Sequence, residues 1–406
     1  MKISANSALC GVEKASALKV RILIVGFSTR AIAESAARGG YDVVTLDYFG
    51  DRDQKELVEN YSLMRDFQLD FSAEALLEAS RSLDFQAVAY NSSLENHPDV
   101  VEKLAEGHAL LGNSPAVLRQ VRDWSHLRSV CCRENIAHPV TLLPGEEEQA
   151  RGIGHRACSE RIRWVSKPML SGGGHEISFW RGGSLSEKRV LQQWISGEAC
   201  SAAFVADGRR CVLLGLTEQL IGRPELGARG FTWCGNILPL SRPASEMEAI
   251  IRAVREMVEK LTRAFGLRGV NGVDFVLGRG ETGPVPYLVE VNPRYTASME
   301  LVEWAYGLNV FDLHVRSFDR ALPSFSLEAA LQQPGFYGKG IVYARQDVVM
   351  PETAGWRERG RRDVPFPEER IAAHHPICTV LVRGETRDEC WARLLVETEM
   401  VWQELR

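Results

Sequence analysis

The sequence lacks the marks of several protein classes. Its nine cysteines contain no CxxC pair, and the adjacent Cys131 and Cys132 have no metal-ligand spacing, which favours reduced thiols over a disulfide framework or a zinc site. No apolar run approaches the roughly 18 residues of a membrane span, and residues 1–19 contain no signal-peptide core. We therefore expect a cytoplasmic protein with no membrane partner, in which residues 1–19 are a loosely ordered tail.

An excess of charge of one sign is also missing. Charged residues make up 25% of the 406 residues, and the formal net charge at pH 7 is −5. There is no overall basic field that would favour a nucleic acid or an anionic membrane as a partner. A chain of this length exceeds one ordinary domain, and we expect two or three.

Residues 20–118 alternate between apolar runs and helical patterns. The run from Val20 to Phe27 indicates a strand that ends near Gly26, a short helical pattern follows, and "YDVVTLDYF" predicts a second strand. This alternation predicts a doubly wound α/β domain with a parallel sheet.

The end of the first strand is partly similar to a dinucleotide site, because Gly26 follows the strand and Asp47 lies about 20 residues further on. The dinucleotide fingerprint, however, requires glycines where Ser28 and Ala31 stand. A nicotinamide-dependent oxidoreductase is therefore a minor alternative.

Residues 119–325 are predicted to form a second unit, with a small lobe over residues 119–192 and a large lobe over residues 193–325. One helix is expected in "AVLRQVRDWSHLRSVCCREN", followed by two apolar strands around a glycine-rich connection. An amphipathic helix that closes on Gly266 precedes a β-hairpin. Residues 326–406 are expected to form a small β-rich segment with a terminal helix that packs on this unit.

The hairpin "GVDFVLGRGETGPVPYLVEVN" is predicted to carry acidic residues on one face. With a turn centred near Thr282, Asp274 should face Glu290, and Val276 should face Leu288. Asn292 follows Glu290 by two residues and points the same way. The opposite face should be apolar and fix the register, with Val273, Phe275 and Leu277 against Tyr287, Val289 and Val291.

Two carboxylates that face each other repel, so a cation is expected between them. Mg²⁺ takes oxygen ligands, commonly one or two carboxylates together with nucleotide phosphates. Asp274, Glu290 and Asn292 are therefore candidate ligands for Mg²⁺ or Mn²⁺. The alternative is a solvated outer face on which the carboxylates pair with arginines.

A candidate phosphate site lies at the end of an earlier strand. Lys167 ends the apolar run "WVSK", and three glycines follow it, namely Gly172, Gly173 and Gly174. An ammonium group beside a loop of backbone N–H groups can bind phosphates without a helix. A glycine-rich connection alone, however, is commonly no more than a turn.

The segment "LQQWISGE" lies between the glycine loop and the acidic hairpin. It offers an apolar slot of the kind that an adenine ring needs, with Gln192, Ile195 and Glu198 as candidate nucleoside contacts. An ordinary strand and turn is an equally good interpretation of this segment alone.

The order of these parts, ending in "LVEVNPR", resembles the ATP-grasp superfamily over most of residues 20–330. The resemblance implies that Lys167 contacts the phosphates of ATP and that Arg294 stabilises developing charge, both as catalytic residues. It also implies a lid, a nucleoside site and a magnesium site, formed respectively by Gly172 to Gly174, by Gln192, Ile195 and Glu198, and by Asp274, Glu290 and Asn292.

Two details of the resemblance concern particular positions. The ending of the chain is similar to biotin-carboxylase-like members at residues 363–365 and 376–386, but we find no biotin-carrier tripeptide MKM. Trp124 stands beside Asp123 where relatives often carry a lysine, and Arg122 and Arg128 are the candidate substitutes.

The resemblance implies an ATP- and magnesium-dependent ligase that activates a small carboxylate as an acylphosphate and transfers it to an amine or similar nucleophile. Positioning and charge neutralisation suffice for this chemistry. Arg223 or Arg229, in the loop Ile221–Leu240, could contact an anionic substrate, although a plain surface loop is equally compatible. A noncatalytic ATP-binding module is the main alternative, and a homodimer is a candidate assembly.

Overall fold

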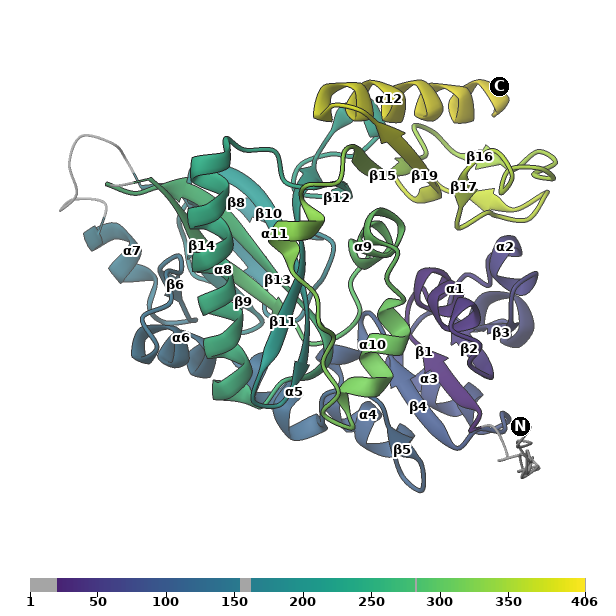
Figure 1. Ribbon diagram of the computed structural model, residues 1–406, viewed down its shortest axis with the longest axis horizontal. Helices are drawn as coiled ribbons and strands as arrows, with labels where there is room; N and C mark the ends of the chain where they lie inside the picture. The colour runs from purple at the N-terminus through teal and green to yellow at the C-terminus, as the bar shows by residue number, and fades with distance from the viewer. Residues whose placement is uncertain (1–19, 154–161, 282, 406) are drawn as a thin grey trace, which may run out of the picture.

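The computed structural model describes residues 20–153, 162–281 and 283–405. The predicted tail, residues 1–19, lies outside the described residues. Figure 1 shows an α/β unit in purple and blue, a central antiparallel sheet in teal and green, and a yellow C-terminal region beside both. Among the described helices, none is both long and apolar enough to cross a bilayer.

The predicted parallel sheet is present near the start of the chain. It has five strands in the order β3-β2-β1-β4-β5, and every neighbouring pair is parallel. Both faces of β1 and β4 are buried, so these strands are apolar throughout instead of alternating. The five strands are β1 (Ile22–Val25), β2 (Val43–Asp47), β3 (Glu59–Ser62), β4 (Ala87–Tyr90) and β5 (Ala109–Leu110).

Helices cover both faces of this sheet, as a doubly wound fold requires. On one face α1 (Arg30–Arg38) packs with α10 (Val310–Ser317). On the other face lie α3 (Ala73–Ser80), α4 (Pro98–Leu104) and α5 (Pro115–Val121). Three short elements complete this region: α2 (Arg52–Lys55), a π-helical turn at Leu63–Phe67 and a 3₁₀ turn at Leu94–Asn96.

The single helix predicted around Arg119 is wrong, because the chain breaks there into two. Helix α5 ends at Val121, and α6 (Trp124–Arg133) begins two residues after Arg122. The side chain of Asp123 accepts hydrogen bonds from Ser125 N and His126 N, at 2.8 and 3.1 Å. Asp123 is therefore the N-cap of α6, and this cap restarts the helix in a new direction.

A four-stranded antiparallel sheet follows, in the order β6-β9-β7-β8. Its strands are β6 (Thr141–Leu142), β7 (Trp164–Pro168), β8 (Ser178–Phe179) and β9 (Arg189–Gln193), with α7 (Glu147–Ile153) beside β6. Lys167 lies on β7, and the glycine loop joins β7 to β8.

The central sheet has eight antiparallel strands in the order β14-β13-β10-β11-β12-β15-β19-β17. Its first five strands are β10 (Gly197–Asp207), β11 (Cys211–Ile221), β12 (Trp233–Leu238), β13 (Arg268–Arg279) and β14 (Pro284–Asn292), with a 3₁₀ turn at Pro224–Leu226. Helix α8 (Ala244–Phe265) packs on one face through residues at helical spacing, among them Ile250, Val254, Val258 and Leu261. The predicted helix end at Gly266 is confirmed, since this residue has a left-handed φ of 68°.

The C-terminal segment extends the same sheet. Strands β15 (Phe336–Tyr343) and β19 (Pro376–Gly384) continue it from β12, and α12 (Arg387–Glu404) packs on them. The remaining elements are α9 (Met299–Tyr306), α11 (Leu327–Ala330), β16 (Val348–Val349), β17 (Arg361–Arg362) and β18 (Arg370–Ile371). The mixed α/β architecture that the sequence predicts is thus confirmed.

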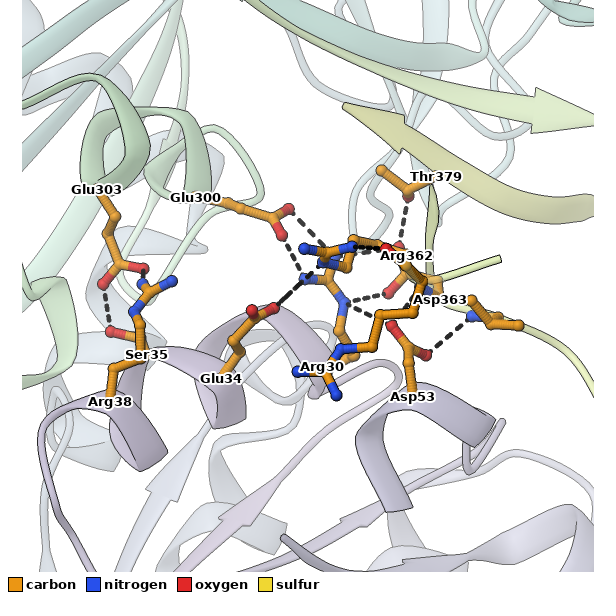
Figure 2. A network of polar contacts seen from close by, with 12 residues as sticks. Arg30, Glu34, Ser35, Arg38, Asp53, Glu300, Glu303, Arg362, Asp363 and Thr379 are labelled. Carbon is orange, nitrogen blue, oxygen red and sulfur yellow. Dashed lines mark hydrogen bonds and ion pairs between the residues drawn. The ribbon is translucent and has the colours of Figure 1, made fainter. Parts of the chain in front are cut away.

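Three regions of the chain meet in a buried polar network (Figure 2). Arg30, at the start of α1, is fully buried and pairs with Glu300 of α9 and with Asp363 of the C-terminal segment. Lys339 of β15 also reaches Glu300, with Nζ 2.7 Å from Oε2. Beside this group, Glu303 of α9 accepts hydrogen bonds from two residues of α1, Ser35 and Arg38.

Candidate functional site

The predicted acidic pair is formed on the last two strands of the central sheet. Asp274 of β13 and Glu290 of β14 are direct cross-strand partners, as expected. Asp274 accepts a hydrogen bond from Asn292 Nδ2 at 2.9 Å and another from Gln219 Nε2 at 2.8 Å. Burial and the charge of Glu290 raise the pKa of Asp274 to about 7. Burial, reinforced by the charge of Glu290, therefore favours the protonated form of Asp274 near neutral pH.

The predicted hairpin register is confirmed as far as Asp274, since Val273 faces Val291 as expected, but it is wrong by one residue from Phe275 toward the turn. A β-bulge between Asp274 and Phe275 shifts the pairing, so that Leu288 faces Phe275, and Tyr287 faces Val276. Because a shift of one residue reverses the face, Leu288 lies in the core, whereas Tyr287 and Val289 are only half-buried. The predicted turn centre, Thr282, lies outside the described residues.

Two cations lie against the acidic pair. Arg122 Nη1 donates to Glu290 Oε1 at 2.5 Å, and Arg122 Nη2 donates to Ser171 O at 3.3 Å. Burial opposes the ionisation of Glu290, but the charges of Arg122 and Lys167 outweigh it and hold the pKa of Glu290 below its usual value. Arg122, which enters from the break between α5 and α6, therefore contacts the predicted metal ligand directly.

Lys167 is almost fully buried beside this pair. Burial lowers the pKa of its ammonium group to about 8, although the charge of Glu290 acts in the opposite direction. Its Nζ lies 4.2 Å from the ring centroid of Trp124 and 3.5 Å from Val289 O. Trp124, which departs from the family pattern, thus supplies an aromatic face to the lysine instead of a charge of its own.

Arg294 follows β14 and joins the same group. Its Nη2 donates to Asn292 Oδ1 at 3.4 Å, and its Nε donates to Glu95 Oε1 at 2.7 Å. Glu95 lies in the 3₁₀ turn Leu94–Asn96, which follows strand β4 of the N-terminal parallel sheet. The structure therefore brings together five predicted site residues, which are Lys167, Asp274, Glu290, Asn292 and Arg294.

The glycine loop lies against the loop between β11 and β12. Trp233 N donates to Gly173 O at 3.0 Å. A Cβ atom added at Gly174 would lie 1.8 Å from Phe231 O, and Gly174 has a φ of +79°, so this position requires glycine for two reasons. The ring of Phe231 packs edge-on against Phe179 of β8, with centroids 5.3 Å apart. The glycine loop, which is the predicted lid, is thus held against the loop between β11 and β12 by a hydrogen bond and by ring packing.

The predicted nucleoside residues lie at the junction of the two antiparallel sheets. Ile195 packs against Gly278 of β13. The side chain of Gln192 is buried and donates to Thr141 Oγ1 at 3.2 Å, whereas Glu198 forms an ion pair with Arg242. Glu198 and Gln192 are therefore held by partners within the chain, and Ile195 is the apolar member at this junction.

The other basic residues singled out from the sequence lie elsewhere. Arg128 contacts Thr141 O and Glu146, so Arg122 is the candidate substitute that reaches the acidic pair. Arg229 Nη1 lies 3.0 Å from His374 Nε2. Arg223 lies 4.0 Å from Glu218, which also binds Arg387 of α12.

The residues considered for a dinucleotide site make close contacts within the chain. A Cβ atom at Gly26 would lie 2.7 Å from Ser92 O, so this glycine permits close packing of two loops. Asp47 is fully buried and accepts hydrogen bonds from Thr29 Oγ1 and Gly50 N, at 2.6 and 2.8 Å. The carboxylate that would bind a ribose is thus engaged within the chain.

Two residues of the site were missed by sequence reasoning. Gln219 lies near the end of β11, directly after Thr217 and Glu218, so its polarity did not set it apart in the sequence. Glu95 follows the run "AVAY" by a few residues, where the carboxyl end of a parallel strand is itself a signal for ligand contacts.

The donor set at the acidic pair fits a hard divalent cation. Two carboxylates and one side-chain amide lie on neighbouring strands, and Mg²⁺ prefers oxygen ligands. The amide directs its nitrogen at Asp274 and its oxygen at Arg294, so it would have to turn to offer its oxygen to a cation. When Asp274 is ionised, a second negative charge lies beside Glu290, and a bound cation would favour this form. Asp274, Glu290 and Asn292 are the residues that could hold such a cation.

Comparisons with known proteins agree with this geometry. The family described as "ATP-grasp domain" matches residues 144–298. An uncharacterised protein of Methanocaldococcus jannaschii is 20% identical over 90% of this chain and 88% of its own.

Two solved structures share the fold at low sequence identity. The biotin carboxylase domain of Hydrogenobacter thermophilus 2-oxoglutarate carboxylase has a TM-score of 0.68 and 14% identity, covering 92% of this chain and 88% of that one. An L-amino acid ligase from Bacillus licheniformis has a TM-score of 0.63 and 16% identity, covering 93% of this chain and 97% of that one. Residues 144–298 thus match the ATP-grasp domain family, and the chain as a whole shares the fold of these two structures.

Proposed function

We propose that the chain is an ATP- and Mg²⁺-dependent ligase that joins a small carboxylate to an amine or similar nucleophile. The observation that carries the proposal is the meeting of an oxygen donor set with three cations, namely Asp274, Glu290 and Asn292 with Arg122, Lys167 and Arg294. Five of these six residues lie within residues 144–298, the segment that matches the ATP-grasp domain, and Arg122 lies before it.

Each group has a defined part in this proposal. Asp274, Glu290 and Asn292 would hold Mg²⁺, which when bound would screen the charge of the phosphates. Lys167 neutralises charge on the phosphates, and Arg294 stabilises the charge that develops during transfer. The substrate carboxylate displaces ADP from the γ-phosphate to give an acylphosphate. The amine then forms the C–N bond, loses a proton and releases phosphate.

The two solved structures support this reaction class. The Bacillus protein is an L-amino acid ligase, and the Hydrogenobacter domain is a dimer in complex with MgADP and bicarbonate. We propose residues 20–118, 119–325 and 326–406 as the units of the chain, with the phosphate and metal groups supplied by the second. Self-association as a homodimer remains a prediction.

An ADP-release assay over amino acids and small carboxylates, with and without candidate amines, tests the proposal. ADP formation that requires both Mg²⁺ and a carboxylate is expected. Nucleotide binding without turnover across the panel would favour a noncatalytic ATP-binding module. Reduction of a nicotinamide cofactor is not expected, because Asp47 is engaged within the chain.

The rate of ADP formation is expected to depend on pH as a bell-shaped curve. Asp274 must lose its proton to bind a cation, and its pKa of about 7 sets the acidic limb of kcat/KM. Lys167 must keep its proton to neutralise phosphate, and its pKa of about 8 sets the alkaline limb. The maximum should therefore lie between these two values.

The Lys167→Arg variant provides the control for this profile. A guanidinium stays protonated throughout the accessible range, so the alkaline limb should move to higher pH even if the overall rate falls. An alkaline limb that stays in place in this variant would contradict the assignment to Lys167. Raising the Mg²⁺ concentration should move only the acidic limb, toward lower pH, because a bound cation favours ionised Asp274.

A further inference from the structure

The loop at residues 91–96 contains three buried oxygen atoms without a hydrogen-bond partner. They are Asn91 Oδ1, Glu95 Oε2 and Asn96 Oδ1, and the three side chains are only 7%, 2% and 7% exposed. Buried polar atoms in folded proteins are almost always paired. Three unpaired atoms in six residues therefore indicate that this loop is built for a partner that the chain alone does not supply.

The position of the loop in the sheet is one where ligands bind. It follows the carboxyl end of β4, which lies next to β1 in the order β3-β2-β1-β4-β5. From β1 the chain continues to β2 and β3 on one side of the sheet, and from β4 it continues to β5 on the other side. The strand order therefore reverses between β1 and β4. In open parallel α/β sheets, ligands bind in the crevice at the carboxyl ends of the strands at such a reversal.

The loop also faces the phosphate and metal groups of the proposed site. Glu95 Oε1 accepts from Arg294 Nε at 2.7 Å, which leaves Oε2 free. Tyr90 lies just before the loop, and its OH donates to the carbonyl oxygen of Pro293, the residue before Arg294, at 3.1 Å. Asn91 Nδ2 is anchored on Ser28 O at 2.9 Å, so its oxygen is the free end of the amide. The unpaired oxygen of Glu95 thus belongs to the carboxylate that binds the arginine of the proposed reaction, and Asn91 and Asn96 lie in the same short loop.

The chemistry of the three atoms selects the kind of ligand. An ionised carboxylate accepts hydrogen bonds and donates none, and the two amide oxygens are also acceptors. A ligand that satisfies them must therefore present several N–H donors, and a positive charge suits the carboxylate best. A protonated primary amine has these properties, whereas a carboxylate or phosphate group would be repelled by Glu95.

We propose that the loop 91–96 binds the amino group of the acceptor substrate, with Glu95 Oε2 as the counter-ion of its ammonium form; the ammonium gives one proton to Glu95 Oε2 before its nitrogen attacks the acylphosphate. The inference rests on the proposed ligase function and deepens it. It assigns the acceptor as a primary amine and places it in the loop after β4, whose Glu95 binds Arg294. Asn91 and Asn96 orient the same group through their amide oxygens.

Steady-state kinetics of the full chain test this assignment. Glu95→Gln keeps an oxygen for Arg294 Nε but replaces the counter-ion with a neutral amide. It should raise KM for the amine by roughly 10- to 100-fold, which is more than it changes KM for ATP or for the carboxylate. A purely structural role, in which Glu95 only holds Arg294, would instead lower carboxylate-dependent ADP release measured without amine and leave the amine KM unchanged. That outcome, or an unchanged amine KM, would overturn the proposal.

Asn96→Ala and Asn60→Ala form a matched pair. Both residues are buried asparagines with an unpaired Oδ1, but Asn60 lies on the edge strand β3. Asn96→Ala should raise the amine KM, and Asn60→Ala should leave it unchanged. Equal effects of the two variants would mean that the unpaired oxygens of this domain are satisfied by water alone.

A binding measurement separates this inference from the ligase proposal. Ethylammonium chloride, observed by ligand-detected NMR against potassium chloride of equal ionic strength, should bind the wild-type chain and not Glu95→Gln. Such a difference without any ADP release would support the amine site and count against the ligase. ADP release together with equal binding to both proteins, or with no binding to either, would support the ligase and overturn the amine site.

Discussion

Glu290→Gln is expected to lower Mg²⁺-dependent ADP formation by about 10²–10³-fold, as loss of one preorganised electrostatic group in an enzyme site commonly does. Glu290 is the one carboxylate of the pair that the surrounding cations keep ionised, since burial alone would raise its pKa and the charges of Arg122 and Lys167 reverse that effect. Glutamine preserves the shape and one oxygen atom but removes the charge. The measurement is the initial rate of ADP release as a function of Mg²⁺ concentration.

The same substitution should also change the behaviour of Lys167. The charge of Glu290 raises the pKa of this buried ammonium, so its removal should move the alkaline limb of the residual activity to lower pH. Glu146→Gln is the matched control, because Glu146 is partly buried and pairs with Arg128 at 2.8 Å, away from the acidic pair. Equal losses in the two variants, or undiminished turnover in Glu290→Gln, would contradict the assignment of Glu290 as a metal ligand.

The acidic pair illustrates what a sequence can predict. Alternation along two apolar runs placed Asp274 opposite Glu290, because a buried face fixes the register of a hairpin. The bulge one residue later could not be predicted in the same way. An extra residue on one strand hardly changes the alternation of apolar residues in the sequence. Only the packing of Leu288 into the core reveals it.

Long-range contacts account for the rest of what was missed. The hydrogen bond between Gly173 and Trp233 joins two loops that look like ordinary turns in the sequence. Glu95 and Arg294 are 199 residues apart, and the sequence around either residue does not predict contact with the other. The break before α6 is different, because Asp123 followed by helical residues is a readable N-cap signal. Recognition of that cap would have placed Arg122 at a helix junction and not on a helix face.

The buried network in Figure 2 leads to the prediction with the largest expected effect on stability. Arg30→Met is expected to destabilise the fold by about 3–5 kcal/mol, because removal of one partner leaves buried charges uncompensated. Arg30 is fully buried and binds Glu300 and Asp363. Burial alone would raise the pKa of each of these carboxyls, but Arg30 and Lys339 hold both values below normal. The free energy of unfolding in urea measures the loss.

The pH dependence of this loss distinguishes it from a simple packing defect. Without Arg30, Lys339 alone opposes the effect of burial, so the folded-state pKa values of Glu300 and Asp363 rise, and the penalty is full at high pH and shrinks as the carboxyls take up protons. The destabilisation should therefore be smaller at pH 5 than at pH 8. Arg38→Met is the control, since Arg38 lies on the same helix and pairs with Glu303 of α9, but its side chain is 50% exposed. An exposed arginine of this kind should cost about 1 kcal/mol or less. A loss in Arg30→Met that does not vary with pH, or that only equals the loss in Arg38→Met, would show that the network does not tie the three regions together by charge.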